Sequence, residues 1–409
     1  MAFDAKTASV PLSVLSTEKK DQALVAMAKA LVKNRSRVLK ANAKDVRAAK
    51  EKGLAPSLIG RLSLDEYRIK KIADSLLLIS RLPDPVGRVI STTKRPNGLL
   101  IKKVGVPIGV ILIIYESRPN VTADCMALCL KSGNSVILKG GSEAAYSNEV
   151  IYQILNEAAV KHGVPKGVFQ FVSGSGRGAV KELLGLTESI DLVIPRGGEG
   201  LIREVARISK IPVIKHYKGI CHVFLDKAAD LGIAQAIVLN AKVQNPGVCN
   251  AMETLLVHQA VARRFLPKIC SALKEKGVEL RGDEATRKIV HGVKKATEQD
   301  WAAEYLDLIL SVRVVKDLKA AVAHIQRYGS RHSDAIVTED KQAAEEFTRS
   351  VDSACVFVNC STRFSDGGEF GMGAEMGIST DKLHARGPMG LEELTSYKYL
   401  VSGNGQVRP

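Results

Sequence analysis

The sequence predicts an α/β protein that is built around a parallel β-sheet and divided into more than one domain. From Val106 onward, short apolar segments alternate with helical segments, and glycine-rich turns join them. Parallel strands are connected by crossover helices, and ligands bind such sheets at the carboxyl ends of the strands. A chain of 409 residues is too long for one hydrophobic core, so we expect two or three domains.

The N-terminal part of the chain is predicted to be helical, with helices over residues 18–52 and 64–81. Leu24, Met27 and Leu31 share one face of the first helix, and lysines occupy much of its remaining surface. The first helix ends at a glycine and the second ends before a proline, and both residue types terminate helices.

A β-hairpin is expected over residues 88–104, because Asn97 and Gly98 form a tight-turn pair between two extended segments. Residues 394–401 have the pattern of an edge strand. We expect the hairpin and this strand to form a small β element that contacts other subunits, as in a homodimer or homotetramer.

The parallel sheet is expected after the hairpin, where each short apolar strand is followed by a glycine turn and a helix. A second alternating region is expected from Gln244 to Val358. The strands of the first sheet are expected at residues 110–114, 135–138, 168–172 and 190–194, with a fifth beginning at Val213. The longer apolar run over residues 106–115, which contains the first of them, also has the character of a buried strand.

One glycine turn has the spacing of a dinucleotide-binding motif. Gly174, Gly176 and Ala179 match G-x-G-x-x-A after a predicted strand and before a helix, where backbone N–H groups can hold a pyrophosphate. The acidic residue expected about 20 positions later is missing, so a tight turn without a ligand is the alternative. Arg177 in the same turn favours the interpretation that this turn binds a phosphate.

A second turn places Lys139 and Ser142 where they could bind a ribose phosphate. The alternative is that they serve only as a surface lysine and a helix cap.

The seven cysteines are scattered and form no CxxC pair, so we expect neither a disulfide framework nor a metal site. Cys249 differs from the others because Pro246 and Gly247 bend the chain before it. Backbone N–H groups at such a bend lower the pKa of a thiol and stabilise an oxyanion. The alternative is a buried structural thiol, which is the common role of a cysteine.

The composition restricts the classes of function. The formal net charge of +16 is spread along the chain, which indicates either a solvated basic surface or a field that attracts anionic substrates. Aromatic residues make up 5%, and we expect no nucleic-acid partner. No segment has the length of a membrane span, and residues 1–10 lack the pattern of a secretory signal, so we expect a cytoplasmic protein without a membrane partner.

Four segments together resemble the gamma-glutamyl phosphate reductase family of the aldehyde dehydrogenase superfamily. They are residues 115–122, 244–255, 373–380 and 384–391. The resemblance implies an aldehyde dehydrogenase-like fold with a Rossmann-type NADP-binding domain over residues 1–228 and an α/β catalytic domain over 229–360. Residues 361–409 would return to the cofactor domain and end in the oligomerisation strand.

The resemblance also assigns roles to individual residues. Cys249 corresponds to the nucleophile, and Asn120 corresponds to the asparagine whose amide forms the oxyanion hole with the cysteine backbone. The residues that would bind NADPH or NADP are Lys139, Ser142, Ser173, Gly174, Arg177, Gly197 and Glu375. Candidates for binding the substrate are Arg118, His216 and Arg363.

One departure from the wider superfamily favours reduction. Oxidising members have a glutamate that activates water about 34 residues before the cysteine, whereas this chain has His216, which lies 33 residues before Cys249. A reductase gains nothing from a base that hydrolyses its acyl-enzyme. His216 could act as an acid or a phosphate ligand, or be a hydrogen-bonded polar residue without a chemical role.

The resemblance implies NADPH-dependent reduction of L-glutamyl 5-phosphate to L-glutamate 5-semialdehyde in proline biosynthesis, through a Cys249 thioester and with release of phosphate. The substrate is labile, which leaves an association with glutamate 5-kinase open. The alternatives are a related enzyme for another acyl phosphate or acyl thioester, and an inactive homologue. The presence of both Cys249 and Asn120 argues against the second alternative.

Overall fold

A computed structural model describes residues 1–116, 118–174 and 177–408. The chain forms two compact units. The first unit contains residues 1–215, 371–377 and 389–409, and the second contains residues 216–370 and 378–388. Within the described residues, no helix has both the length and the apolar character that crossing a membrane requires.

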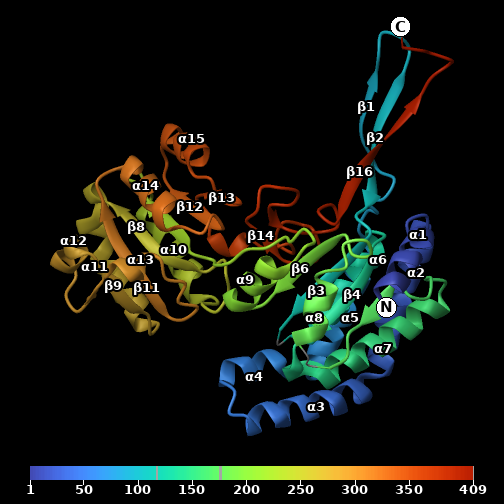
Figure 1. The fold of residues 1–409 in the computed structure, drawn as a ribbon. Coiled ribbons are helices and arrows are strands. Elements are labelled where there is room, and N and C mark those ends of the chain that lie inside the picture. The colour runs from blue at the N-terminus through green and yellow to red at the C-terminus, as the bar shows by residue number, and fades with distance from the viewer. Residues whose placement is uncertain (117, 175–176, 409) are drawn as a thin grey trace. The chain divides into compact units, whose positions relative to one another are not determined.

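The first unit is organised around a parallel four-stranded sheet with the order β5-β4-β3-β6. Its two central strands are buried along their whole length, because helices cover the sheet (Figure 1). The strands are β3 (Val110–Tyr115), β4 (Ser135–Gly140), β5 (Phe169–Phe171) and β6 (Leu192–Arg196). The helices are α6 (Asn120–Lys131), α7 (Ala145–Lys161), α8 (Arg177–Leu183) and α9 (Glu199–Ile208), with a 3₁₀ turn η1 (Ser142–Ala144) before α7.

Two predictions for this sheet need correction. The apolar run over residues 106–115 is not one strand, because Gly109 has a φ of +132° and the carboxylate of Asp191 lies where a Cβ would stand. The chain therefore leaves one sheet before this glycine and enters another after it. The fifth strand is reduced to a single bridge between Val193 and Val213.

Five helices precede the sheet: α1 (Ala2–Leu12), α2 (Thr17–Lys33), α3 (Arg35–Glu51), α4 (Pro56–Leu62) and α5 (Glu66–Arg81). The prediction of one helix over residues 18–52 is wrong, because the helix divides at Asn34. The side-chain amide of Asn34 donates to the carbonyl of Ala30 at 2.8 Å, and such local bonds compete with helix propagation. The predicted helix over residues 64–81 is confirmed as α5, with Asp65 as its N-cap.

An antiparallel ribbon extends from the rest of the first unit (Figure 1). It has the order β1-β2-β16 and consists of β1 (Val89–Lys94), β2 (Leu100–Pro107) and β16 (Thr395–Ser402). Gly98 in the turn has a φ of +90°, which explains the Asn-Gly pair. The predicted hairpin and terminal strand are thus confirmed. The apolar side chains of Val89, Ile90, Leu400 and Val401 are exposed on the ribbon.

The second unit contains a parallel seven-stranded sheet with the order β10-β9-β11-β8-β7-β12-β13. Residues 221–225, which we predicted to lie in the first domain, form β7 near the centre of this sheet. The strands are β7 (Cys221–Leu225), β8 (Met252–His258), β9 (Glu279–Gly282), β10 (Lys294–Lys295), β11 (Ile309–Val315), β12 (Ser333–Val337) and β13 (Cys355–Val358). The helices are α10 (Leu231–Val243), α11 (Gln259–Glu275), α12 (Glu284–Ile289), α13 (Glu298–Trp301), α14 (Leu318–Tyr328) and α15 (Lys341–Ser350).

The second unit also has a 3₁₀ turn, η2 (Thr362–Phe364), and a short antiparallel pair, β14 (Ile378–Ser379) and β15 (Gly387–Pro388). Its largest apolar core packs α10 and α11 against the sheet, with Leu255, Leu266 and Ile269 fully buried. The central strands β7 and β8 are buried along their whole length. The turns that precede β7 and β8 are therefore attached to closely packed strands, which restricts their movement.

Candidate active site

The thiol of Cys249 lies in a cluster with two histidines of the second unit. Its sulfur and one ring nitrogen each of His216 and His332 lie within 4.8 Å of one another. Cys249 precedes β8, His216 precedes β7 and His332 directly precedes β12. Because β7 pairs in parallel with both β8 and β12, the amino ends of the three strands are adjacent. The fold thus joins residues that are far apart in the sequence.

Hydrogen bonds fix the orientation of both imidazole rings. Nδ1 of His216 lies 2.8 Å from the carbonyl oxygen of Ile378. A carbonyl only accepts, so Nδ1 carries a proton, and in the neutral form of the ring Nε2 has the lone pair. The two rings meet edge to face, with centroids 5.5 Å apart.

His332 is fully buried, and its Nδ1 lies 2.9 Å from the hydroxyl of Ser333. Its Nε2 has no hydrogen-bond partner among the described residues. Burial lowers the pKa of His332 to about 3, and the nearby His216 adds to the shift. The ring is therefore neutral at physiological pH. Sequence reasoning missed His332, because a lone histidine before an apolar strand has no distinctive pattern.

The turn that carries Cys249 is packed tightly against the segment before β7. A Cβ placed on Gly219 would lie 1.9 Å from the carbonyl oxygen of Cys249, so only glycine fits there. The thiol of Cys221 donates to the same carbonyl at 3.2 Å. Burial raises the pKa of Cys221 well above the usual range, so this thiol stays protonated. The amide of Gly219 in turn donates to Glu304 at 2.8 Å.

Residues around η2 hold both ends of the same turn. Asn250 donates to the carbonyl of Ser365 at 2.8 Å, and the Thr362 hydroxyl donates to the carbonyl of Asn250 at 2.8 Å. At the other end, Nε of Arg363 donates to the side chain of Gln244 at 2.8 Å. Burial lowers the pKa of Arg363, and the acidic groups of Asp366 and Cys249 oppose that shift. The structure thus brings three predicted residues together in one unit: Cys249, His216 and Arg363.

A buried ion pair follows the Cys249 turn. Nζ of Lys242 in α10 lies 2.6 Å from a carboxylate oxygen of Glu253 in β8, and both side chains are fully buried. The second oxygen of Glu253 accepts from the amide of Leu306 at 3.1 Å. Burial raises the pKa of Glu253, and the lysine opposes the shift. The pair ties the end of α10 to the start of β8, so it fixes the two elements between which Cys249 lies.

The first unit contains a pocket of about 730 Å³ at the carboxyl ends of β3, β4 and β5. Three predicted cofactor residues, Ser142, Ser173 and Gly174, line it. The glycine turns after β4 and β5 therefore form one wall of the pocket, as expected for a parallel sheet. The other lining residues are Asp45, Ala48, Ala49, Lys52, Leu54, Leu58, Glu116, Gly140, Gly141, Glu143, Ala145, Tyr146, Glu149, Phe171 and Val172.

Two carboxylates shape this pocket. Asp45 accepts the backbone N–H groups of Tyr146 and Ser147 at 3.2 and 2.8 Å, which anchors the first turn of α7. Burial raises the pKa of Asp45. Glu116 accepts the amide of Gly198 at 2.8 Å, and a Cβ on Gly197 would lie 2.3 Å from its oxygen. Only glycine at position 197 thus allows the carboxylate of Glu116 to lie this close to the backbone.

The remaining cofactor predictions lie elsewhere in the first unit. Lys139 is buried and does not line the pocket; its Nζ donates to the carbonyl of Gly140 at 2.9 Å, and burial lowers its pKa. Glu375 is half-buried and precedes Met376, which packs against Cys125. The side chain of Arg177 lies outside the described part of the structure, as does Gly176 of the glycine motif.

Asn120 is the first residue of α6, and its amide donates to the carboxylate of Asp124 one turn later at 3.0 Å. That bond uses one of the two amide hydrogens. Burial raises the pKa of Asp124. Asn120 and the exposed Arg118 belong to the first unit, whereas Cys249 belongs to the second.

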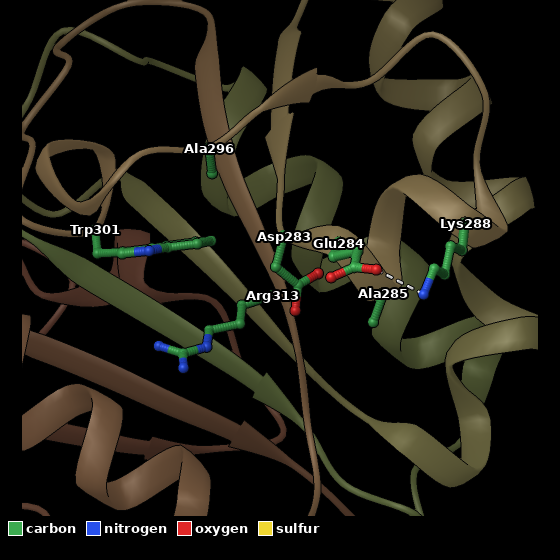
Figure 2. Close-up of a pocket in the computed structure, with 7 residues that line it drawn as sticks. All are labelled: Asp283, Glu284, Ala285, Lys288, Ala296, Trp301 and Arg313. Carbon is green, nitrogen blue, oxygen red and sulfur yellow. Dashed lines mark ion pairs between the residues drawn. The ribbon is translucent and has the colours of Figure 1, made fainter.

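A further pocket of about 510 Å³ lies in the second unit, after strands β9 and β10 (Figure 2). The guanidinium of Arg313 lies 5.5 Å from the ring of Trp301, and Lys288 pairs with Glu284 at 2.6 Å. Among the described residues that line this pocket there is none of the predicted site residues and no cysteine, serine or histidine. Its described lining residues therefore offer no thiol, serine hydroxyl or imidazole for acyl transfer.

Similarity to known proteins identifies the family of this chain. The model of the aldehyde dehydrogenase family matches residues 4–292. The gamma-glutamyl phosphate reductase of Moorella thermoacetica is 56% identical over 404 residues, which cover 99% of this chain and 97% of the relative. The one from Geobacter metallireducens is 55% identical over 408 residues, covering 100% and 98%.

Among solved structures, the gamma-glutamyl phosphate reductase of Thermotoga maritima matches with a TM-score of 0.98 at 46% identity, covering 100% of this chain and 99% of that one. The chain belongs to the aldehyde dehydrogenase family and, within it, to the gamma-glutamyl phosphate reductases. The family and the aldehyde dehydrogenase-like α/β fold predicted from the sequence are thereby confirmed.

Proposed function

We propose that this chain reduces L-glutamyl 5-phosphate to L-glutamate 5-semialdehyde with NADPH and releases phosphate, as a step of proline biosynthesis. The observation that carries the proposal is the half-buried thiol of Cys249, which shares a cluster with His216 and His332 and electrostatically influences Arg363. A nucleophile beside nitrogen bases and a cation is the arrangement that acyl transfer from an acyl phosphate needs. The names of the relatives support the choice of substrate.

In the first step, the thiolate of Cys249 attacks the acyl carbon of the substrate. A carbon–sulfur bond forms, the bond between that carbon and the phosphate oxygen breaks, and inorganic phosphate leaves. Arg363 is suited to the anionic groups of the substrate, because a guanidinium pairs with carboxylate and phosphate oxygens. The Nε2 lone pair of His216 is suited to accept the thiol proton, which can then pass to the departing phosphate.

Negative charge develops on the acyl oxygen during both attack and reduction. The resemblance assigns its stabilisation to the backbone N–H of Cys249 and the amide of Asn120. The bond from Asn120 to Asp124 supports this role, because it fixes the amide and leaves one of its hydrogens for the substrate. Arg118, two residues earlier in the chain, is a second candidate for binding the substrate.

The pocket after β3, β4 and β5 has the volume and the glycine turns that a nucleotide requires. We propose that Ser142, Ser173 and Gly174 hold NADPH there. Lys52, which also lines the pocket, would supply a positive charge for the phosphates. Bound NADPH would supply the hydride that reduces the thioester carbon and is itself oxidised to NADP. When the tetrahedral species collapses, the carbon–sulfur bond breaks and the thiolate of Cys249 is restored. The preference for NADPH over NADH and roles for Lys139, Arg177, Gly197 and Glu375 belong to the same proposal.

We further propose that the β1-β2-β16 ribbon joins subunits into a homodimer or homotetramer, because its strands expose apolar side chains and unpaired edges. An association with glutamate 5-kinase would shield the labile acyl phosphate, and it stays a prediction.

The reverse reaction tests the proposed activity. Purified protein is supplied with pyrroline-5-carboxylate, which is in equilibrium with the aldehyde, together with phosphate and NADP, and NADPH absorbance is followed. We expect phosphate-dependent NADPH formation that is lost in Cys249→Ala and kept in Cys360→Ala, which removes another half-buried thiol of the same unit. Wild-type activity in Cys249→Ala would exclude the mechanism.

A further inference from the structure

We propose that Cys249, His216 and His332 together bind a borderline-soft divalent cation of the Zn²⁺ type, and that the bound ion inhibits the enzyme reversibly. A cysteine thiolate and two imidazoles are preferred ligands of zinc, and three protein ligands leave a fourth position for water. The binding itself is independent of the proposed reaction. The inhibition rests on that proposal, because it requires Cys249 to be the nucleophile.

The geometry of the cluster is close to that of a metal site. The three ligand atoms lie within 4.8 Å of one another. Ligands of a tetrahedral zinc ion with ordinary bond lengths are about 3.3–3.8 Å apart. A contraction of about 1 Å by rotation of side chains would therefore complete the site. His216 and Cys249 are half-buried, which leaves room for such rotation, whereas the buried His332 is the fixed ligand.

The hydrogen bonds of the two imidazoles supply an independent argument. Histidines that bind metals usually direct their other ring nitrogen to a carbonyl or another polar group, which fixes the ring. His216 does so through Ile378, and His332 does so through Ser333. Nε2 of His332 is then the atom of that ring which is available as a ligand. For His332 this atom is buried and has no partner among the described residues, a situation that a bound ion would relieve.

No sequence pattern predicts this site. His216 lies 33 residues before Cys249, and His332 lies 83 residues after it, so no zinc-ligand spacing exists. The site is created by the adjacent amino ends of β7, β8 and β12. It therefore departs from the sequence-based expectation that the chain has no metal site.

The surroundings determine which ions are suitable. The ligand set contains no carboxylate, so the hard cations Mg²⁺ and Ca²⁺, which prefer oxygen, are poor candidates. The guanidinium of Arg363 interacts electrostatically with Cys249 and repels a dication. Removal of that charge in Arg363→Gln should consequently strengthen metal binding.

Co²⁺ is the direct probe, because it substitutes for zinc and its thiolate complexes absorb light through charge transfer from sulfur. The full-length, reduced protein is titrated with Co²⁺ and then with Zn²⁺, without substrate or cofactor. We expect one Co²⁺ per chain with a thiolate charge-transfer band that Zn²⁺ removes. The band should vanish in Cys249→Ser and persist in Cys360→Ser. The affinity should fall at least about tenfold in His332→Asn.

Three results would overturn the proposal. They are the absence of the charge-transfer band in wild type, a band that survives in Cys249→Ser, and an unchanged Co²⁺ affinity in His332→Asn. His216→Asn provides the same test at a half-buried position if the buried substitution prevents folding, and circular dichroism monitors the fold. In the reverse assay, micromolar Zn²⁺ should inhibit wild type and a chelator should restore its activity. Since the titration needs no turnover, a protein that binds Co²⁺ but lacks reductase activity would refute only the proposed function.

Discussion

Gly219 lies against the backbone of Cys249, so close that a Cβ at position 219 would stand 1.9 Å from the carbonyl oxygen of Cys249. The same carbonyl accepts the thiol of Cys221. The position of the proposed nucleophile is thus set by the segment that also carries His216, and not by its own turn alone. Conversely, any side chain at position 219 must displace the turn.

Gly219→Ala should therefore slow the reaction without unfolding the protein. A displacement of about 1 Å at a reacting group costs on the order of 100-fold in rate, and we expect a fall in kcat of that size. Gly200→Ala is the matched control, because at that helical position the added methyl group would have nothing within 4 Å apart from its own helix backbone and chain neighbours. Steady-state kinetics and thermal unfolding of both variants check the prediction. Equal kcat values for Gly219→Ala and wild type would contradict it.

Removing one member of the buried pair of Lys242 and Glu253 should destabilise the protein more than removing both. Lys242→Met leaves the buried carboxylate of Glu253 without its cation, and we expect a loss of about 3–5 kcal/mol in the free energy of unfolding. The double variant Lys242→Met, Glu253→Leu should recover most of that loss, since no charge remains buried. Urea denaturation measures both, with the exposed Lys268→Met as control. A double variant no more stable than the single one would refute this account.

Buried histidines predict that stability falls with acid. Burial lowers the pKa of His324 to about 2, with further contributions from His222, Arg313 and Arg327. An unfolded histidine has a pKa of about 6.5, so below that pH the unfolded chain binds a proton that the folded ring does not accept. The folded state is therefore favoured at neutral pH and loses stability as the pH falls.

From about pH 7.5 to about pH 5, this difference in pKa should cost about 2 kcal/mol in the free energy of unfolding. His324→Asn keeps an acceptor for Arg313, which donates to Nδ1 at 2.8 Å, and it should reduce the acid-induced loss by that amount. The exposed His291→Asn should not reduce it. Denaturation curves at the two pH values decide the matter, and an identical loss in His324→Asn and wild type would count against the prediction.

Gly197 provides a test of the proposed cofactor pocket. A methyl group there would lie 2.3 Å from the carboxylate of Glu116, which lines the pocket and accepts the amide of Gly198. Gly197→Ala should therefore weaken NADPH binding about tenfold, which corresponds to about 1.4 kcal/mol, and raise KM for NADPH more than it lowers kcat. Fluorescence titration with NADPH measures the affinity directly. Unchanged binding would place the cofactor elsewhere.

The sequence predicts the local features of this fold well. The strand at β3 follows from a buried apolar run, and the hairpin follows from Asn97 and Gly98, whose conformation local chemistry determines. Division of the N-terminal helix at Asn34 was not predictable from hydrophobic periodicity, because the pattern continues across the break and a single side-chain bond decides it.

The site is less accessible to sequence reasoning. Cys249 could be singled out by the bend before it and by the family resemblance, whereas His332 and the Lys242–Glu253 pair become meaningful only when strands pair. The cofactor role of Lys139 stays a prediction: this residue lies near the carboxyl end of β4, and its buried amine donates to the adjacent backbone carbonyl of Gly140. Proximity across a sheet depends on strand order, and local patterns do not determine that order.

The central claim is that Cys249 carries the acyl group, and the most direct measurement is the mass of the enzyme after acylation. The protein is incubated with L-glutamyl 5-phosphate, generated in place by a kinase, in the absence of NADPH. Intact-protein mass spectrometry should then show one added glutamyl group, located on the peptide that contains Cys249 and discharged as aldehyde when NADPH is added. An adduct that persists in Cys249→Ala, or turnover in wild type with no adduct on that peptide, would contradict the account.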